Sequence, residues 1–222
     1  FPLVTPGTKF VTLGGAIAAD VHGKNHHKDG SFRACVDWID VMGHDGEVRQ
    51  FSRKKDATLF DYTLGGMGLT GIILRAAIRL RPIETALIRQ TTIAAPNLKS
   101  VMAAFEAAQG ATYSVAWIDC LGTGGNLGRS LVMLGEHATR SDLVPKQARA
   151  PFRVKSKRKL SIPVDLPAFT LNSLTLRAFN AFYYWAGARK TGVQLVDWDS
   201  YFYPLDAILG WNRIYGSKGF AQ

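Results

Sequence analysis

A stretch near the amino end of the chain carries almost no side chain. Six of the ten residues from Gly14 to Gly23 are Gly or Ala. Such residues are used where a second backbone or a flat ligand must come close, because a larger side chain would fill the space. The stretch ends among ionisable residues, namely Asp20, His22 and Lys24. This pattern predicts a bare ligand-facing surface with reactive groups at its edge, and a tightly packed buried element followed by a solvated turn is the alternative.

The same stretch has the signals of a short helix. Thr12 is a favourable N-cap for a helix that begins at Gly14, and Gly23 has the conformational freedom that ends one. The apolar residues here recur at helical spacing: Leu13, Ile17 and Val21. We therefore expect His22 and Lys24 at the helix C-terminus, where the backbone carbonyl dipoles favour positive charge.

A second glycine-rich segment follows later. Four of the seven residues from Gly65 to Gly71 are glycine, which indicates positive φ angles or close approach of another group. The segment lacks the spacing of a dinucleotide-binding fingerprint and of a phosphate-binding loop. It is therefore not a nucleotide motif of either common type.

The composition is that of a globular protein with an excess of positive charge. The chain has 222 residues, of which 47% are hydrophobic, and Lys and Arg exceed Asp and Glu by 27 − 17 = 10. A basic surface favours anionic partners such as phosphates, anionic lipids or nucleic acid. No apolar run approaches the length of a membrane span. Cys35 and Cys120 lack the spacing of a metal site or redox pair, so we expect two reduced cysteines and no metal.

The remaining pattern predicts a helix packed on an antiparallel sheet, an α+β class. Apolar runs bounded by turn residues predict strands, and apolar stripes at helical spacing predict helices. Strands are expected at residues 36–42, 48–51, 72–82, 88–94, 113–120, 129–135 and 193–202, and helices at 56–63, 97–109 and 173–190.

Two further segments are open to two interpretations. Arg149 to Lys159 is strongly basic and is either a solvated loop or a mobile flap that meets anionic lipid. The helix expected at 173–190 is rich in Leu, Phe and Tyr, and its aromatic face either packs in the core or lies at a membrane interface.

Several blocks of the sequence resemble the FAD-linked oxidases of the vanillyl-alcohol-oxidase-like superfamily. The resemblance is greatest to the branch that acts on polyprenylphosphoryl ribose. Met67 departs from the pattern, because the family has Asn there. The blocks that carry the resemblance are Thr5–Thr8, Gly14–His27, Gly65–Ile73, Tyr113–Asp119, Tyr203–Asp206, Trp211–Gly216 and Gly219–Gln222.

The resemblance implies two domains. Residues 1–85 would be the second half of a PCMH-type FAD-binding domain, and residues 86–222 part of an antiparallel-sheet substrate (cap) domain. A basic flexible loop is expected at about residues 138–172. The chain is expected to be an internal portion of a longer protein, because the family's pyrophosphate-binding loop would precede it and a further lysine would follow it.

The family's site residues can be carried over to matching positions. His22 would orient the sugar or move a proton, and Lys24 would meet the sugar or its phosphate, although a structural histidine and a surface lysine are the alternatives. Trp117, Phe202 and Gln222 would join Lys24 in binding the substrate. Non-covalent FAD would contact Gly7, Thr8, Thr12, Leu13, Gly14, Gly15, Ala19, Asp20, Val21, His22, Gly68 and Ile73.

The resemblance also implies an activity. The whole protein would oxidise the 2'-hydroxyl of polyprenylphosphoryl-β-D-ribose, the first step of epimerisation to the arabinose donor for cell-wall arabinan. An NAD(P)H-dependent keto-reductase would be its partner. We expect it at a membrane surface, on the cytoplasmic or periplasmic face, without a transmembrane segment in this chain and without nucleic acid. The alternatives are another sugar, polyol or aldonolactone oxidase of the superfamily, or a non-catalytic basic domain that binds anionic lipid or nucleic acid.

Overall fold

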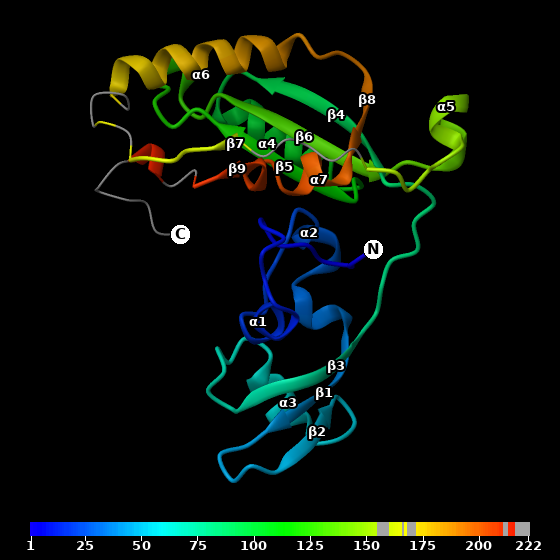
Figure 1. Ribbon diagram of the computed structural model, residues 1–222. Helices are drawn as coiled ribbons and strands as arrows, with labels where there is room; N and C mark the ends of the chain where they lie inside the picture. Colours follow the sequence, from blue (N-terminus) through cyan, green and yellow to red (C-terminus); the bar gives the residue numbers. More distant parts are fainter. Residues whose placement is uncertain (155–159, 166, 168–171, 211–212, 216–222) are drawn as a thin grey trace. The chain divides into compact units, whose positions relative to one another are not determined.

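The computed structural model describes residues 1–154, 160–165, 167, 172–210 and 213–215 (Figure 1). The chain divides into two compact units, of which unit 1 is Phe1–Ile83 and unit 2 begins at Glu84. Each unit combines helices with an antiparallel sheet, which confirms the α+β class. The assignment of the two units to a flavin half and a substrate half stays a prediction.

Unit 1 is built on a three-stranded antiparallel sheet in the order β2-β1-β3. The strands predicted at 36–42 and 48–51 are present as β1 and β2, which pair as an antiparallel hairpin. The helix predicted at 56–63 is present as α3. The elements of this unit are α1 (Leu13–Ala18), α2 (His26–Asp29), η1 (Phe32–Cys35), β1 (Val36–Met42), β2 (Val48–Ser52), α3 (Ala57–Thr63) and β3 (Ile72–Ile78).

The core of unit 1 lies on one face of this sheet. Ile39 and Phe51 pair across β1 and β2 and are buried together with Ile17 of α1 and Phe60 of α3. Asp40 points to the opposite face because side chains alternate along a strand. Its carboxylate is buried there and forms an ion pair of 2.7 Å with Arg75. Burial of apolar surface on one face therefore seats α1 against the sheet.

Unit 2 is a four-stranded antiparallel sheet in the order β5-β6-β4-β8, with a helix on each face. Val132 of β6 packs with Val101 of α4. The neighbouring residue Leu131 points the other way, against Gly187 of α6. The main elements are β4 (Leu87–Ala95), α4 (Leu98–Ala107), β5 (Tyr113–Ile118), β6 (Ser130–His137), α6 (Ser173–Ala188) and β8 (Val193–Asp197).

Shorter elements connect these. A two-stranded parallel pair, β7 and β9, joins two distant segments. The elements are η2 (Gly124–Asn126), η3 (Arg140–Asp142), α5 (Pro145–Ala148), β7 (Leu160–Ser161), α7 (Trp198–Phe202), η5 (Leu205–Ala207) and β9 (Ile208–Leu209). The loop predicted at 138–172 thus contains η3, α5 and β7, and the lysines at 155, 157 and 159 lie outside the described residues.

The strand predicted at 193–202 is wrong in its second half. Strand β8 ends at Asp197, whose carboxylate accepts a hydrogen bond of 2.8 Å from the Ser200 backbone and begins helix α7. A capping carboxylate that satisfies an unpaired N–H favours the helix over the strand. Among the described residues, no helix combines the length and hydrophobicity that a bilayer crossing requires.

Candidate functional site

Helix α1 begins as the sequence predicts but ends earlier. The Thr12 hydroxyl accepts a hydrogen bond of 3.0 Å from the Gly15 backbone, so Thr12 is the N-cap. The helix ends at Ala18, and Asp20 adopts a left-handed φ of 44°. The prediction that Gly23 ends the helix, with His22 and Lys24 at its C-terminus, is therefore wrong. Asp tolerates the left-handed region better than most residues, and its contacts explain why it adopts it here.

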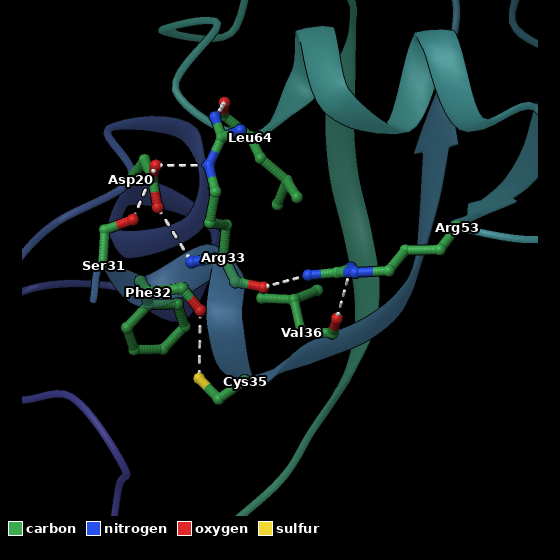
Figure 2. Close-up of polar contacts among 8 residues, drawn as sticks. All are labelled: Asp20, Ser31, Phe32, Arg33, Cys35, Val36, Arg53 and Leu64. Carbon is green, nitrogen blue, oxygen red and sulfur yellow. Dashed lines mark hydrogen bonds and ion pairs between the residues drawn. The ribbon is translucent and has the colours of Figure 1, made fainter. Parts of the chain in front are cut away.

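Asp20 is held by a network of hydrogen bonds within unit 1 (Figure 2). Its carboxylate accepts from the Ser31 hydroxyl at 3.0 Å, from the Arg33 backbone at 2.8 Å and from Arg33 Nε at 2.6 Å. Burial alone would raise the pKa of this carboxyl, but these hydrogen bonds outweigh burial and lower the pKa below its ordinary value. The side chain predicted to contact the flavin is therefore engaged in a structural network.

Arg33 extends this network to the second glycine-rich segment. One guanidinium nitrogen donates to the Leu64 carbonyl at 2.6 Å, and Leu64 directly precedes Gly65. The sequence pattern offered no signal for Arg33, because its partners lie 13 and 31 residues away. Arg33 is thus a functional candidate that the fold alone reveals.

Backbone hydrogen bonds also join the two glycine-rich segments directly. The Gly65 N–H donates to the Ile17 carbonyl at 3.2 Å, and the Met67 N–H donates to the Ala18 carbonyl at 2.9 Å. Gly14 lies against β3, since a Cβ added there would be 3.8 Å from the Cβ of Ile73. Residues 7–15, 65–69, 72 and 73 together are called the glycine surface below.

The glycine surface exposes apolar side chains beside bare backbone. Leu69 is 91% exposed and Met67 73%. A Cβ added at Gly7 or Gly68 would meet no atom within 4 Å, so open space lies beside both residues. Exposed apolar surface of this kind marks a contact site. The exposed large apolar side chains are Phe10, Val11, Leu13, Met67, Leu69 and Ile72.

Of the other predicted flavin contacts, some lie in or beside α1, whereas Val21 packs into the protein. Thr8 lies in the segment that leads into α1, where its hydroxyl accepts a hydrogen bond of 3.2 Å from the Phe10 backbone. Ala19 is exposed just after α1. Val21 instead packs against the core of unit 1. The side chain of Val21, like that of Asp20, therefore turns toward the protein.

His22 and Lys24 lie in the segment between α1 and α2. His22 is exposed, and its ring meets the ring of His26 edge to face with 5.4 Å between the centroids. Lys24 is partly buried, and this burial lowers the pKa of its ammonium group to about 8. An exposed imidazole and a partly buried ammonium group two residues apart can bind an anion and pass a proton to or from a bound ligand.

Two residues hold this segment against the rest of unit 1. Asn25 is fully buried and donates to the Leu3 carbonyl at 2.8 Å and to Asp29 Oδ2 at 2.7 Å. A Cβ added at Gly23 would lie 2.3 Å from the Thr5 carbonyl oxygen. Gly23 therefore permits close approach of two backbones, which is a role different from the predicted helix ending.

In unit 2, Trp117 and Phe202 are on the same face of the sheet. The Trp117 ring lies 4.8 Å from that of Tyr183 on α6. Phe202 of α7 is buried and packs edge to face on Tyr113, with 4.9 Å between centroids. Tyr113 and Trp117 share a face because they are four residues apart on β5. Gln222 lies outside the described residues, and the grouping of these residues with Lys24 in one substrate pocket stays a prediction.

The described residues contain no cluster of three or more His, Cys, Asp or Glu side chains arranged to hold a metal ion. The candidate site in unit 1 consists of the glycine surface, the Asp20–Arg33 network and the segment with His22 and Lys24.

Comparison with known proteins shows what the chain is similar to. No protein-family model matches the chain. The chain is 37% identical over 225 residues to decaprenylphosphoryl-beta-D-ribose oxidase of Mycolicibacterium smegmatis, which covers 99% of the chain and 48% of that protein. It is 37% identical over 176 residues to an uncharacterised protein of Streptomyces coelicolor, covering 79% of the chain and 47% of that protein.

A shorter similarity links the chain to cytokinin dehydrogenase 5 of Arabidopsis thaliana, with 35% identity over 74 residues, 33% of the chain and 14% of that protein. The chain spans about half the length of the first two relatives. These similarities confirm the resemblance found in the sequence: the chain is a relative of decaprenylphosphoryl-beta-D-ribose oxidase along nearly the whole of its own length.

Proposed function

We propose that this chain belongs to a flavin-dependent oxidoreductase that oxidises the 2'-hydroxyl of a polyprenylphosphoryl-β-D-ribose to a ketone. The observation that carries the proposal is the glycine surface, where bare backbone and exposed apolar side chains lie side by side. The name of the Mycolicibacterium relative supports a decaprenylphosphoryl ribose as the substrate class.

The residues of the glycine surface fit a flavin ring. An isoalloxazine is flat and needs a wall without protruding side chains, and open space lies beside Gly7 and Gly68. Leu13 and Met67 offer apolar contacts at that wall. For Asp20 and Val21 we propose contact through the backbone, because their side chains are engaged within unit 1. The other residues that would hold non-covalent FAD are Thr8, Thr12, Gly14, Gly15, Ala19, His22 and Ile73.

A bound flavin would supply the hydride acceptor, and the protein supplies placement and charge. Lys24 is mostly protonated at pH 7, because its pKa of about 8 lies above that pH. Its ammonium group would bind the phosphate or a hydroxyl of the sugar as a point charge. His22, which is exposed, would orient the sugar or help to move a proton.

On the substrate side, Trp117 is the stronger candidate contact. Trp117 is only partly buried, so part of it would be available to a ligand. Phe202 is buried against other aromatic rings, and we assign it a packing role beneath the substrate-facing residues.

The product determines what else the reaction needs. A 2'-keto sugar becomes the epimer of the starting ribose if a second enzyme returns hydride to the opposite face. An NAD(P)H-dependent keto-reductase is therefore the proposed partner, and the arabinose donor for cell-wall arabinan the proposed final product. A substrate on a polyprenyl lipid also places the reaction at a membrane surface, on either its cytoplasmic or its periplasmic side.

The visible spectrum of the purified whole protein tests this proposal. We expect flavin absorption bands, and release of the flavin into solution on denaturation. Anaerobic addition of polyprenylphosphoryl ribose should bleach the bands. Bleaching by aldonolactones or small polyols alone would instead indicate another oxidase of the same superfamily. Absence of flavin from every preparation, with salt-sensitive binding of liposomes or DNA, would indicate a non-catalytic basic domain.

A further inference from the structure

Helix α6 is firmly attached to unit 2 through one side. A Cβ added at Gly187 would overlap the Leu131 side chain, so helix and sheet are in close contact there. The Asn180 amide donates to Asp119 at 2.7 Å. The Arg129 guanidinium, which pairs with Asp119 at 2.5 Å, lies over the Tyr184 ring. These polar contacts determine which side of α6 faces the sheet.

The opposite side of α6 is apolar and exposed. Leu174 is 76% exposed, Phe182 65% and Trp185 51%. Spacings of eight and three residues place the three side chains on one side of a helix. The Phe182 and Trp185 rings stack, with 5.9 Å between centroids. From Leu174 to Trp185 this stripe extends about 17 Å along the helix at 1.5 Å per residue.

Positive charge accompanies the stripe without any negative charge. The residues from Ser173 to Lys190 include Arg177, Arg189 and Lys190 but no Asp or Glu. The Arg189 guanidinium lies 3.5 Å from the centroid of the Trp185 ring. A surface helix whose outward side is apolar and aromatic, and whose only charges are positive, is typical of a helix that lies in a lipid interface.

We propose that the outward face of α6, formed by Leu174, Phe182 and Trp185 with Arg177 and Arg189, binds the surface of an anionic lipid bilayer. Aromatic rings favour the depth of the lipid headgroups. Arginine and lysine side chains gain attraction from anionic headgroups while their stems stay on the apolar side. The 16 residues of α6 are fewer than a bilayer crossing needs, so the helix would lie parallel to the membrane.

This inference goes beyond the proposed oxidation, because it names the surface by which the protein meets the membrane. It does not depend on flavin binding, which involves residues of unit 1. A failure of one proposal would therefore leave the other intact.

Co-sedimentation of the purified protein with lipid vesicles tests the inference. Vesicles of phosphatidylcholine mixed with phosphatidylglycerol should bind the protein more tightly than phosphatidylcholine alone. The double variant Phe182→Ser/Trp185→Ser should lower the partition coefficient at least about tenfold, since two large apolar side chains lose their lipid contact. Thermal melting should be unchanged, because both side chains are exposed.

Met102→Ser is the matched control, because Met102 is a 57% exposed apolar residue on α4, the helix on the other face of the sheet. It should bind vesicles as the wild type does. Arg177→Gln/Arg189→Gln should reduce the preference for anionic vesicles. The inference would be overturned if the serine double variant and the control lost vesicle binding equally, or if the wild type did not bind anionic vesicles. It would also be overturned if the double variant changed self-association and not vesicle binding.

Discussion

The Arg33 guanidinium lies 2.6 Å from the Asp20 carboxylate and donates through a second nitrogen to the Leu64 carbonyl at 2.6 Å (Figure 2). Asp20 lies near the end of the first glycine-rich segment, and Leu64 directly precedes the second. One side chain therefore connects the two segments that form the glycine surface. Because a flat ligand needs a wall that is rigid before binding, this connection matters for affinity as well as for folding.

Arg33→Lys is expected to weaken that wall. A lysine has one compact ammonium group in place of the planar guanidinium. It can therefore keep the ion pair with Asp20 or the hydrogen bond to the Leu64 carbonyl, but not both. We expect about 1–2 kcal/mol less free energy of unfolding and roughly tenfold weaker flavin binding. Urea unfolding and flavin fluorescence titration measure the two effects. Arg49→Lys, whose ion pairs lie on the exposed hairpin, should change neither, and equal behaviour of the two variants would contradict the assignment.

Asp20→Asn should alter the response of stability to acid. The lowered pKa of Asp20 means that the unfolded state binds more protons than the folded state at acidic pH, so stability rises with pH there. The contribution is complete above the unfolded pKa of about 4 and is lost as pH falls through the folded pKa. The difference in unfolding free energy between wild type and variant should shrink on acidification. A difference that is independent of pH between neutral and strongly acidic conditions would refute this.

Gly7 and Gly23 should respond in opposite ways to a larger side chain. Open space lies beside Gly7, whereas a Cβ at Gly23 would lie 2.3 Å from the Thr5 carbonyl oxygen. Gly7→Leu should leave the free energy of unfolding nearly unchanged but reduce flavin binding at least about tenfold by occupying the ligand's space. Gly23→Ala should destabilise the fold by about 1–3 kcal/mol. Unimpaired flavin binding by Gly7→Leu would remove Gly7 from the proposed site.

The proposed role of Lys24 predicts a pH-dependent substrate affinity. With a pKa of about 8, the ammonium group loses its charge as pH rises through that value, so KM for the phosphorylated substrate should increase above about pH 8. Lys24→Arg keeps its charge over this range and should abolish the increase. Steady-state kinetics measured between about pH 6.5 and about pH 9.5 check this expectation, because that range brackets the pKa. The same rise in KM in both proteins would argue against Lys24.

Asp119 should be critical for seating α6. Its buried carboxylate binds Arg129 at 2.5 Å and Asn180 at 2.7 Å, and these bonds lower its pKa against the opposing effect of burial. Asp119→Ala would leave the largely buried Arg129 without this partner, at a cost of roughly 3 kcal/mol. Asn180→Ala should cost about 1 kcal/mol. Because both residues share one network, the double variant should be less destabilised than the sum of the single variants, and strict additivity in urea unfolding would contradict the network.

Local signals explain which elements could be predicted from sequence. Asn97 begins α4 through a hydrogen bond of 3.0 Å from the Ser100 backbone, and Thr12 begins α1 in the same way. The sequence does not predict the end of β8, because the apolar residues between Val193 and Phe202 recur at spacings that suit a strand as well as a helix. The Asp197 side chain favours the helix by capping its first turn, and the periodicity of apolar residues contains no information about such a cap.

The sequence by itself determined the α+β class and the starts of α1, α3, α4 and α6, because these depend on neighbours within a few residues. The candidate flavin contacts rest on the family resemblance and stay a prediction. The tertiary structure alone decided that α1 meets the Gly65–Gly71 segment, that Arg33 joins them, that Phe202 is buried and that the aromatic side of α6 faces outward. Those outcomes depend on hydrogen bonds and packing between residues tens of positions apart. Such contacts form only when the folded core brings both partners together, so they cannot be predicted from residues that are close in the sequence.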